Sequence, residues 1–202
     1  SELLGLLGSS HNYVQNLYME PVKEVPTNWY LFTNGNSTLQ SINLPQATKI
    51  GYNAFNKCTG LTSIDLSQVT KIGNGTFVNC TSLTNIDLSQ ATDIGENAFW
   101  NCTALTSIDL PQVTDIREDA FFGCTGLKSI VLSGTGTENS FALPTCDTTY
   151  GLGSQNFSPE NLFLTGVTEL TDEQITQCRN WGNKTWANIY YNYKGSPSLA
   201  EA

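Results

Sequence analysis

The stretch NCTSLTNIDLSQATDIGENAFW, residues 79–100, is followed directly by a close copy, NCTALTSIDLPQVTDIREDAFF, at residues 101–122. Four copies of this pattern align without a gap, over residues 39–60, 61–82, 83–104 and 105–126. This constant period predicts a solenoid, in which each repeat forms one coil stacked on the next. The period is too short for the paired helices of repeats of roughly 33 or 34 residues, but it accommodates a strand, a turn and a return segment.

The strictest positions of the repeat are apolar. Counted from the Leu that opens each copy, position 4 is Ile and position 6 is Leu, with polar residues around them, which predicts a strand with one buried face. Position 9 is Ala or Val, position 12 is Ile, and positions 16 and 17 are Ala-Phe, replaced once by Thr76-Phe77. Position 20 is always Cys. The pattern predicts two core columns, formed by Phe55, Phe77, Phe99 and Phe121 and by Cys58, Cys80, Cys102 and Cys124.

The cysteine column is expected to consist of free thiols. Equivalent residues of stacked coils lie about 4.8 Å apart, the spacing of paired strands. Their side chains point in parallel, whereas a disulfide needs converging side chains with Cβ atoms about 3.8 Å apart. A zinc site also needs converging ligands. We therefore expect four reduced, buried cysteines that act as small hydrophobic residues.

The pattern LxxIxLxxVTxIxxxAFxxCTxL resembles the BspA-type leucine-rich repeat, also called the Treponema pallidum type. The Ile-Gly pairs at residues 50–51, 72–73 and 94–95 match it, although Arg117 replaces Gly in the fourth copy. The resemblance implies an α/β leucine-rich-repeat solenoid, a right-handed β-coil of short parallel strands and 22-residue rungs with N- and C-terminal caps. It also implies an extracellular or surface-exposed protein of a host-associated microbe, of the kind described as adhesins or protein-binding scaffolds, with no catalytic residues.

Residues 1–38 differ from the repeats and are expected to form an N-terminal helix or cap with an initial rung. Apolar residues follow an approximately helical spacing as far as Pro21, where the pattern stops: Leu3, Leu7, Val14, Leu17 and Tyr18. Such a helix would cover the first open coil, since a membrane-surface helix requires Lys or Arg on its polar face. Asn36 occupies the position of the repeated Cys, so residues 29–38 are expected to form the initial rung.

Residues 127–160 read as a degenerate fifth repeat, in which Ala142, Leu143 and Cys146 take positions 16, 17 and 20. Residues 161–194 are expected to form a C-terminal cap. There, Thr171 and Gln174 make a capping-box pattern at the start of a helix near residues 172–181. Cys146 and Cys178 lie outside the regular column, and the sequence leaves open whether they are bridged. Residues 195–202 are expected to be disordered.

Charge and composition argue against several classes of protein. The 202 residues contain 9 Lys plus Arg and 18 Asp plus Glu, a formal net charge of -9, which disfavours a nucleic-acid partner. No apolar stretch reaches the roughly 18–20 residues that span a bilayer, so we expect no membrane insertion. The single histidine, His11, lies outside the repeats, and triads and zinc sites depend on imidazole or grouped cysteines. We therefore expect no enzymatic activity and no cofactor.

Two surfaces are candidates for binding. Positions 5 and 8 place polar side chains on or beside the exposed face of the sheet: Asp65, Asp87 and Asp109, and Gln68, Gln90 and Gln112. The aspartates would form a column of like charges, which holds Ca²⁺ only where six or more oxygen ligands converge, so we expect solvated carboxylates and no metal. Position 18 follows the buried Phe, and we expect its side chains Trp100 and Phe122 to form an apolar patch on the flank, either open or covered by a terminal segment.

These patterns favour a non-enzymatic scaffold that mediates protein–protein or host-surface binding. Its partner would be a protein or glycan, such as a host matrix or cell-surface protein. The alternative is a purely structural spacer of a larger surface protein or phage appendage, with no ligand of its own. A binding scaffold is expected to leave an aromatic patch uncovered, and a spacer is expected to have none.

Overall fold

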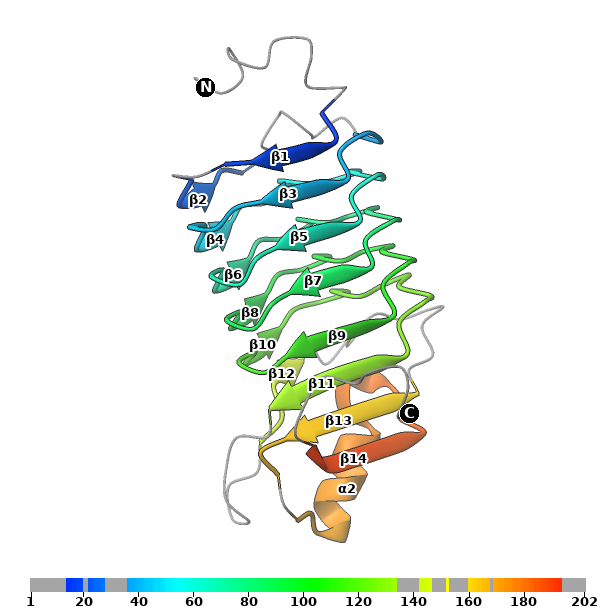
Figure 1. Cartoon of the computed structure of the whole chain (residues 1–202). Helices are drawn as coiled ribbons and strands as arrows, with labels where there is room; N and C mark the ends of the chain where they lie inside the picture. The colour runs from blue at the N-terminus through cyan, green and yellow to red at the C-terminus, as the bar shows by residue number, and fades with distance from the viewer. Residues whose placement is uncertain are drawn as a thin grey trace.

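The structure is a computed structural model of the chain, and it describes residues 14–19, 22–27, 36–133, 142–146, 152, 160–167 and 169–193. Consecutive coils stack along one axis, with one row of strands in front and a second row of shorter strands behind (Figure 1). The strands pair in parallel with their equivalents in the neighbouring coils, as in the pairing of Ile42 with Ile64 and of Ile64 with Ile86. The solenoid predicted from the repeat period is therefore confirmed.

The two rows of strands lie on different sides of each coil. The first row contains β1 (Asn16–Tyr18), β3 (Ser41–Asn43), β5 (Ser63–Asp65), β7 (Asn85–Asp87), β9 (Ser107–Leu110), β11 (Ser129–Ser133), β13 (Asn161–Thr165) and β14 (Asn188–Tyr193). It is divided between β7 and β9 into two four-stranded sheets. The second row is one six-stranded sheet of β2 (Glu24–Val25), β4 (Lys49–Ile50), β6 (Lys71–Ile72), β8 (Asp93–Ile94), β10 (Asp115–Ile116) and β12 (Thr145–Cys146).

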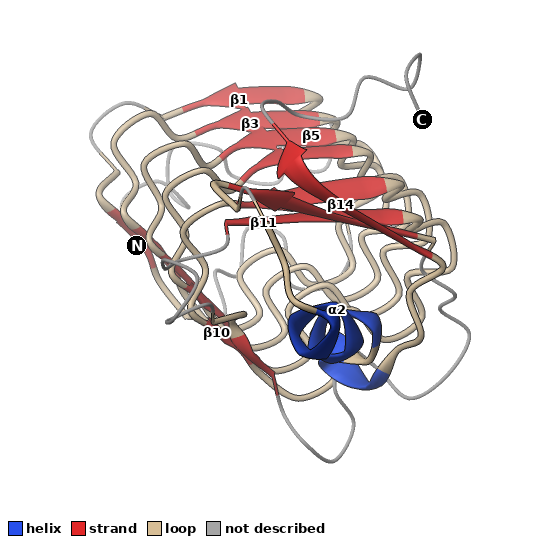
Figure 2. Cartoon of the chain, turned by 90° about the horizontal axis from the view of Figure 1, so that it is seen from below, coloured by secondary structure: helices blue, strands red, loops and turns tan. Residues whose placement is uncertain are grey.

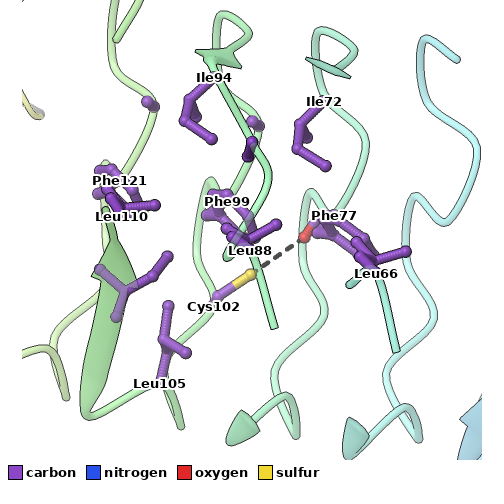
Figure 3. Packing of buried hydrophobic residues seen from close by; sticks show 14 of the residues in the cluster. Leu66, Ile72, Phe77, Leu88, Ile94, Phe99, Cys102, Leu105, Leu110 and Phe121 are labelled. Atoms are coloured by element: carbon purple, nitrogen blue, oxygen red, sulfur yellow. Dashed lines mark hydrogen bonds between the residues drawn. The ribbon is translucent and has the colours of Figure 1, made fainter. Parts of the chain in front are cut away.

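The interior between the rows is filled by the repeated apolar side chains (Figure 3). The four repeat phenylalanines are fully buried, and their rings stack face to face with centroids 5.3–5.5 Å apart. Thr76, in the place of the usual Ala, is also buried, and its hydroxyl lies 2.7 Å from the carbonyl oxygen of Gly73 and 3.2 Å from that of Gly51. Because that hydroxyl is paired, the core accepts a polar atom there without leaving it unsatisfied.

Outside the strand ladders, most hydrogen bonds between coils run in opposite directions on the two sides of the stack. At the residues that flank the strands, backbone N–H groups mostly donate to the preceding coil, as from Thr84 to the carbonyl of Thr62 and from Thr92 to that of Thr70, whereas Met19 donates to Asn43 of the following coil. On the return segment the donors point to the following coil, as from Phe77 to the carbonyl of Ala98. This segment bends through left-handed residues at positions 15 and 19: Asn53, Lys57, Gly75, Asn79, Asn97, Asn101, Asp119 and Gly123. Asn, Asp and Gly adopt that conformation most readily, which explains their recurrence.

The N-terminal residues form a strand where a helix was predicted. Asn16–Tyr18 are β1, which pairs with β3 so that Leu17 lies beside Ile42. Val25 in β2 pairs in turn with Ile50, so the first coil already includes residues upstream of the predicted rung. The prediction of a helix at Leu17 and Tyr18 is wrong. When the coils stack, this short segment pairs with the adjacent strand β3, and that pairing outweighs its local preference. The earlier part of the predicted helix, residues 1–13, lies outside the described residues.

The fifth coil does not keep the phase of the regular repeats. β12 pairs with β10 so that Cys146 lies beside Ile116, at position 12 of the coil rather than position 20. Position 16 is instead taken by Leu152, whose carbonyl accepts from the N–H of Phe121. The assignments of Ala142, Leu143 and Cys146 to positions 16, 17 and 20 are therefore wrong. Strand β13 pairs with β11 at a larger sequence offset than the regular strands have, because the chain is longer here than in a regular coil.

The C-terminal residues replace the return segment of a coil by a helix. The helix α2 (Asp172–Arg179) lies between β13 and β14, as the capping box at Thr171 and Gln174 predicted. A short 3-10 helix (Trp181–Asn183) follows, and Trp181 and Trp186 are buried in the core. The indole N–H of Trp186 donates to the carbonyl of Trp181. In Figure 2, seen along the stack, α2 lies outside both rows of strands, and it contacts β14. Residues 195–202 lie outside the described residues.

Candidate functional site

The repeated cysteines are free thiols that bond to the coil before them. Cys80 Sγ donates to the carbonyl of Phe55 at 3.1 Å, and Cys102 Sγ to that of Phe77 at 3.2 Å (Figure 3). Burial raises the pKa of the Cys58 thiol to about 12 and raises that of Cys102 in the same direction. These thiols are therefore protonated at neutral pH and are poor nucleophiles. Cys146 and Cys178 are free as well.

The exposed face of the first row of strands carries a shallow depression, here called the strand-face hollow. Its volume is about 830 Å³, and Asp65, Asp87 and Asp109 line it together with serines and asparagines of the same strands. Asp65 and Asp87 are direct neighbours in the ladder. Asp109 pairs on its other side with Val131, which ends the acidic column. The hollow is thus polar and acidic over β5, β7 and β9, and Val131 of β11 forms an apolar wall at one end.

The aspartates have a local role that the sequence analysis missed. Asp65 Oδ1 accepts from the N–H of Ser67 at 3.0 Å, and Asp87 Oδ1 from that of Ser89 at 2.9 Å. Each bond closes a turn after the strand, as Asp side chains do in many turns. The Asp-Leu-Ser spacing in the sequence was a usable signal for it. Gln68, Gln90 and Gln112 do not line the hollow, so the structure separates them from the aspartates.

The face of the second row carries charges of both signs. Lys49 Nζ lies 3.1 Å from Glu24 Oε1, and Lys71 Nζ lies 3.6 Å from Asp93 Oδ2. These ion pairs are largely exposed, and pairs of this kind contribute little to stability. They do neutralise the face locally, so the overall negative charge is not concentrated here.

The flank beside the return segments holds the aromatic residues of position 18. The rings of Trp100 and Phe122 stack with centroids 4.1 Å apart, and both side chains are half-buried. Trp100 also lines a second depression, here called the flank hollow, with a volume of about 420 Å³. Tyr52, 48% exposed, lines the same hollow from two coils earlier. The structure therefore places Trp100 at an open hollow, with Phe122 packed behind it.

Two asparagine oxygens at the flank hollow have no hydrogen-bond partner. Asn56 Oδ1 and Asn97 Oδ1 are buried and unpaired, and both residues line the hollow. The amide of Asn97 donates from Nδ2 to Glu96 Oε1 at 3.1 Å. A carboxylate accepts and cannot donate, so this bond fixes which amide atom is left unpaired. No feature of the sequence marked these oxygens, because their surroundings depend on residues of neighbouring coils.

A metal site and a membrane-spanning helix each place requirements on the described part of the chain. No three His, Cys, Asp or Glu side chains come together there in a group able to hold a metal ion. Among the same residues, no helix has the length and apolar character needed to cross a bilayer.

The chain belongs to the BspA-type leucine-rich repeat family, which matches residues 27–143 in six copies. A search of the curated proteins finds no match. Among solved structures, the chain is similar to a leucine-rich cell surface protein of Faecalibacterium prausnitzii A2-165, with 18% identity and a TM-score of 0.45, over 75% of this chain and 64% of that one. It is also similar to the pneumococcal vaccine antigen PcpA, with 17% identity and a TM-score of 0.54, over 88% of this chain and 46% of that one. The chain thus spans less than two thirds of either protein, and the second likeness supports the fold.

Proposed function

We propose that this chain is a non-enzymatic binding scaffold, secreted or displayed at a cell surface, that attaches to a host protein or glycan in the manner of an adhesin. The observation that carries the proposal is the aromatic pair Trp100 and Phe122, stacked beside an open hollow on the flank. Trp and Tyr side chains are the most frequent energetic anchors of protein interfaces. An aromatic pair beside an open hollow is more typical of a binding surface than of a spacer.

The rigid core supports this role. Stacked coils with a fully buried phenylalanine column hold the surface residues of neighbouring coils at fixed spacing. Binding to a preformed surface avoids the entropy cost of ordering it. The strand-face hollow is less suited to anchor a partner. Serine, asparagine and aspartate dominate its lining over β3, β5, β7 and β9, and these side chains seldom act as hot spots.

The test is a binding screen of the purified chain against immobilised host matrix proteins and host cells. Trp100→Ala is expected to weaken binding by about tenfold or more. The matched control is Asn85→Ala, which alters an exposed side chain at the strand-face hollow and is expected to leave binding unchanged.

Two results would contradict the proposal. Binding lost in Asn85→Ala and kept in Trp100→Ala would move the interaction to the strand face. An absence of binding to every matrix protein and cell type would favour the spacer alternative. Thermal melting of each variant distinguishes lost contacts from lost folding.

A further inference from the structure

The flank hollow combines features of a site for a small polar ligand. Its volume of about 420 Å³ lies within the range of roughly 300–1,000 Å³ found for small-molecule sites. Tyr52 and Trp100 stand on opposite sides of it along the stack, because they belong to coils on either side of the one that holds Gly75. The hollow is therefore the width of one coil, with an aromatic ring at each end.

Gly75 opens this space. It occupies position 15, where the neighbouring coils carry Asn53 and Asn97 with the same left-handed conformation. A Cβ on Gly75 would overlap Oδ1 of Asn53, so the missing side chain makes room for the Asn53 amide and for the depression above it. Val78, the position-18 residue of this coil, is also smaller than Trp100 and Phe122 and leaves the hollow free.

The polar groups of the hollow are neutral amides and one carboxylate. Asn56 and Asn97 contribute the unpaired oxygens, and Glu96 lies at the same wall. Among the described residues that line the hollow there is no Lys, Arg or His, so an anionic ligand would meet a carboxylate and no counter-charge. Amide oxygens without partners require a donor to recover the free energy lost by burial, and a hydroxyl group both donates and accepts.

We propose that the flank hollow binds an uncharged sugar residue of a glycan, with its apolar face against Trp100 or Tyr52 and its hydroxyls bonded to the asparagine amides. This inference rests on the proposed function and names the ligand class of the same flank. A sugar ring offers C–H groups on its faces and hydroxyls around its edge. These groups are complementary to the flank hollow, which has an aromatic ring at each end and amides between the rings. Contact with Asn56 and Asn97 requires their buried, unpaired oxygens to turn toward the ligand. The turn breaks the bonds from Asn56 Nδ2 to Asn53 Oδ1 and from Asn97 Nδ2 to Glu96 Oε1, and the sugar hydroxyls replace them.

The experiment is a glycan array of neutral and sialylated glycans, followed by calorimetric titration of the best neutral glycan. Wild-type protein is expected to bind neutral glycans and to bind sialylated ones at least about tenfold more weakly, because of Glu96. Gly75→Asn fills the hollow with a residue that suits this backbone conformation in the neighbouring coils. Its Cβ displaces the Asn53 amide, so the variant is used only if its melting temperature stays close to that of the wild type. It and Trp100→Ala are each expected to reduce affinity about tenfold or more.

The matched control is Gly123→Asn. Gly123 also has a positive φ, 72°, at a position where Asn79 and Asn101 stand in other coils, and a Cβ there meets only ordinary contacts. It does not line the flank hollow, so the variant is expected to bind as the wild type does. Equal binding by wild type, Gly75→Asn and Trp100→Ala would overturn the inference, as would binding confined to amines or acidic sugars.

A second arm separates this inference from the proposed function. A matrix glycoprotein that the chain captures is tested before and after enzymatic removal of its glycans. Loss of capture on deglycosylation supports the sugar site. Capture that survives deglycosylation but is lost in Trp100→Ala overturns the sugar site and leaves the scaffold function standing.

Discussion

Residues 39–126 and residues 127–193 continue the same stack by different means. In the first region each coil repeats the last at a constant interval, and Ile pairs with Ile from β4 through β10. In the second region the interval is longer and uneven, since Ser129 of β11 pairs with Asn161 of β13, and Asn161 pairs with Asn188 of β14. A helix, α2, and two buried tryptophans replace the return segment and the phenylalanine column.

The comparison shows what determines the packing of the interior in each region. In the regular coils every interior side chain meets its own equivalent, so shape complementarity follows from repetition alone. The second region keeps the ladder of the first row but fills the interior with side chains found once, such as Leu152 and Trp186. Strand pairing is therefore the property common to both regions, and the identity of the core residues is what differs. The following predictions test that distinction.

The largest effect is expected from breaking the phenylalanine column. Phe99 is fully buried between two stacked rings, so Phe99→Ala should lower the free energy of unfolding by about 3–5 kcal/mol. Leu143→Ala, at a half-buried residue of the fifth coil, should cost less than about 1.5 kcal/mol. Urea unfolding followed by circular dichroism measures both. Equal losses would mean that the regular coils are no better packed than the fifth.

Gly73→Ala should be the next most damaging change. A Cβ on Gly73 would lie 2.7 Å from the carbonyl carbon of Gly51 and 2.8 Å from the carbonyl oxygen of Ile50, both backbone atoms of the preceding coil. Forcing the coils apart should cost about 1–3 kcal/mol. In the C-terminal region, Gly182→Ala should be costly for a different reason, because φ is 67° there and a Cβ would lie 2.6 Å from Cγ of the buried Leu152. A loss well below about 1 kcal/mol for Gly73→Ala would contradict the role given to close coil stacking.

High pH should lower the free energy of unfolding through the buried cysteine column. Burial raises the pKa of Cys58 from 9.0 to about 12, so between these values the unfolded chain loses the thiol proton before the folded protein does. The free energy of unfolding contributed by this thiol is complete below pH 9.0 and declines as pH rises toward 12, by up to about 1.4 kcal/mol per pH unit. Urea unfolding at several pH values should give a shallower decline for Cys58→Ala. Identical slopes for the two proteins would show that the thiol is solvated.

The smallest effect is expected in the C-terminal helix. Thr171 Oγ1 accepts from the N–H of Gln174, and Gln174 Oε1 accepts from the N–H of Thr171. Thr171→Ala removes one of these bonds and should cost about 1 kcal/mol. Hydrogen exchange should quicken in α2 and stay unchanged in the coils of residues 39–126. Faster exchange throughout the coils would mean that the two regions unfold as one unit.

The regular coils could be predicted from the sequence alone because the chain contains four copies of one pattern, which can be compared with one another. Four copies in phase identify the buried side of each strand, and the interior positions follow from it. The same reasoning failed for Cys146, which lies one repeat period after Cys124 and so keeps the phase by coincidence, while its strand pairs with Ile116. Strand β1 was missed because so short a segment does not distinguish a strand from a turn of helix. At Cys146 and in β1, pairing with a strand of the neighbouring coil determines the structure, and the local sequence pattern does not.

The candidate site was less predictable than the fold. Position 18 was identified as a flank patch because a residue next to a buried Phe cannot also face inward. The flank hollow beside Trp100 depends on the absence of a side chain at Gly75 and on the orientation of two amides, and neither is encoded in the repeat pattern. The proposed binding roles of Trp100, the aspartates and the glutamines stay predictions until a ligand is found.

Every strand of the two rows pairs in parallel with its neighbours, so the two ends of the stack are unlike. A second copy that continued these ladders in the same parallel sense would have to join head to tail. Such a contact builds a fibre unless its rotation closes it into a ring. The parallel register that stacks the coils therefore also fixes the polarity of any end-to-end assembly.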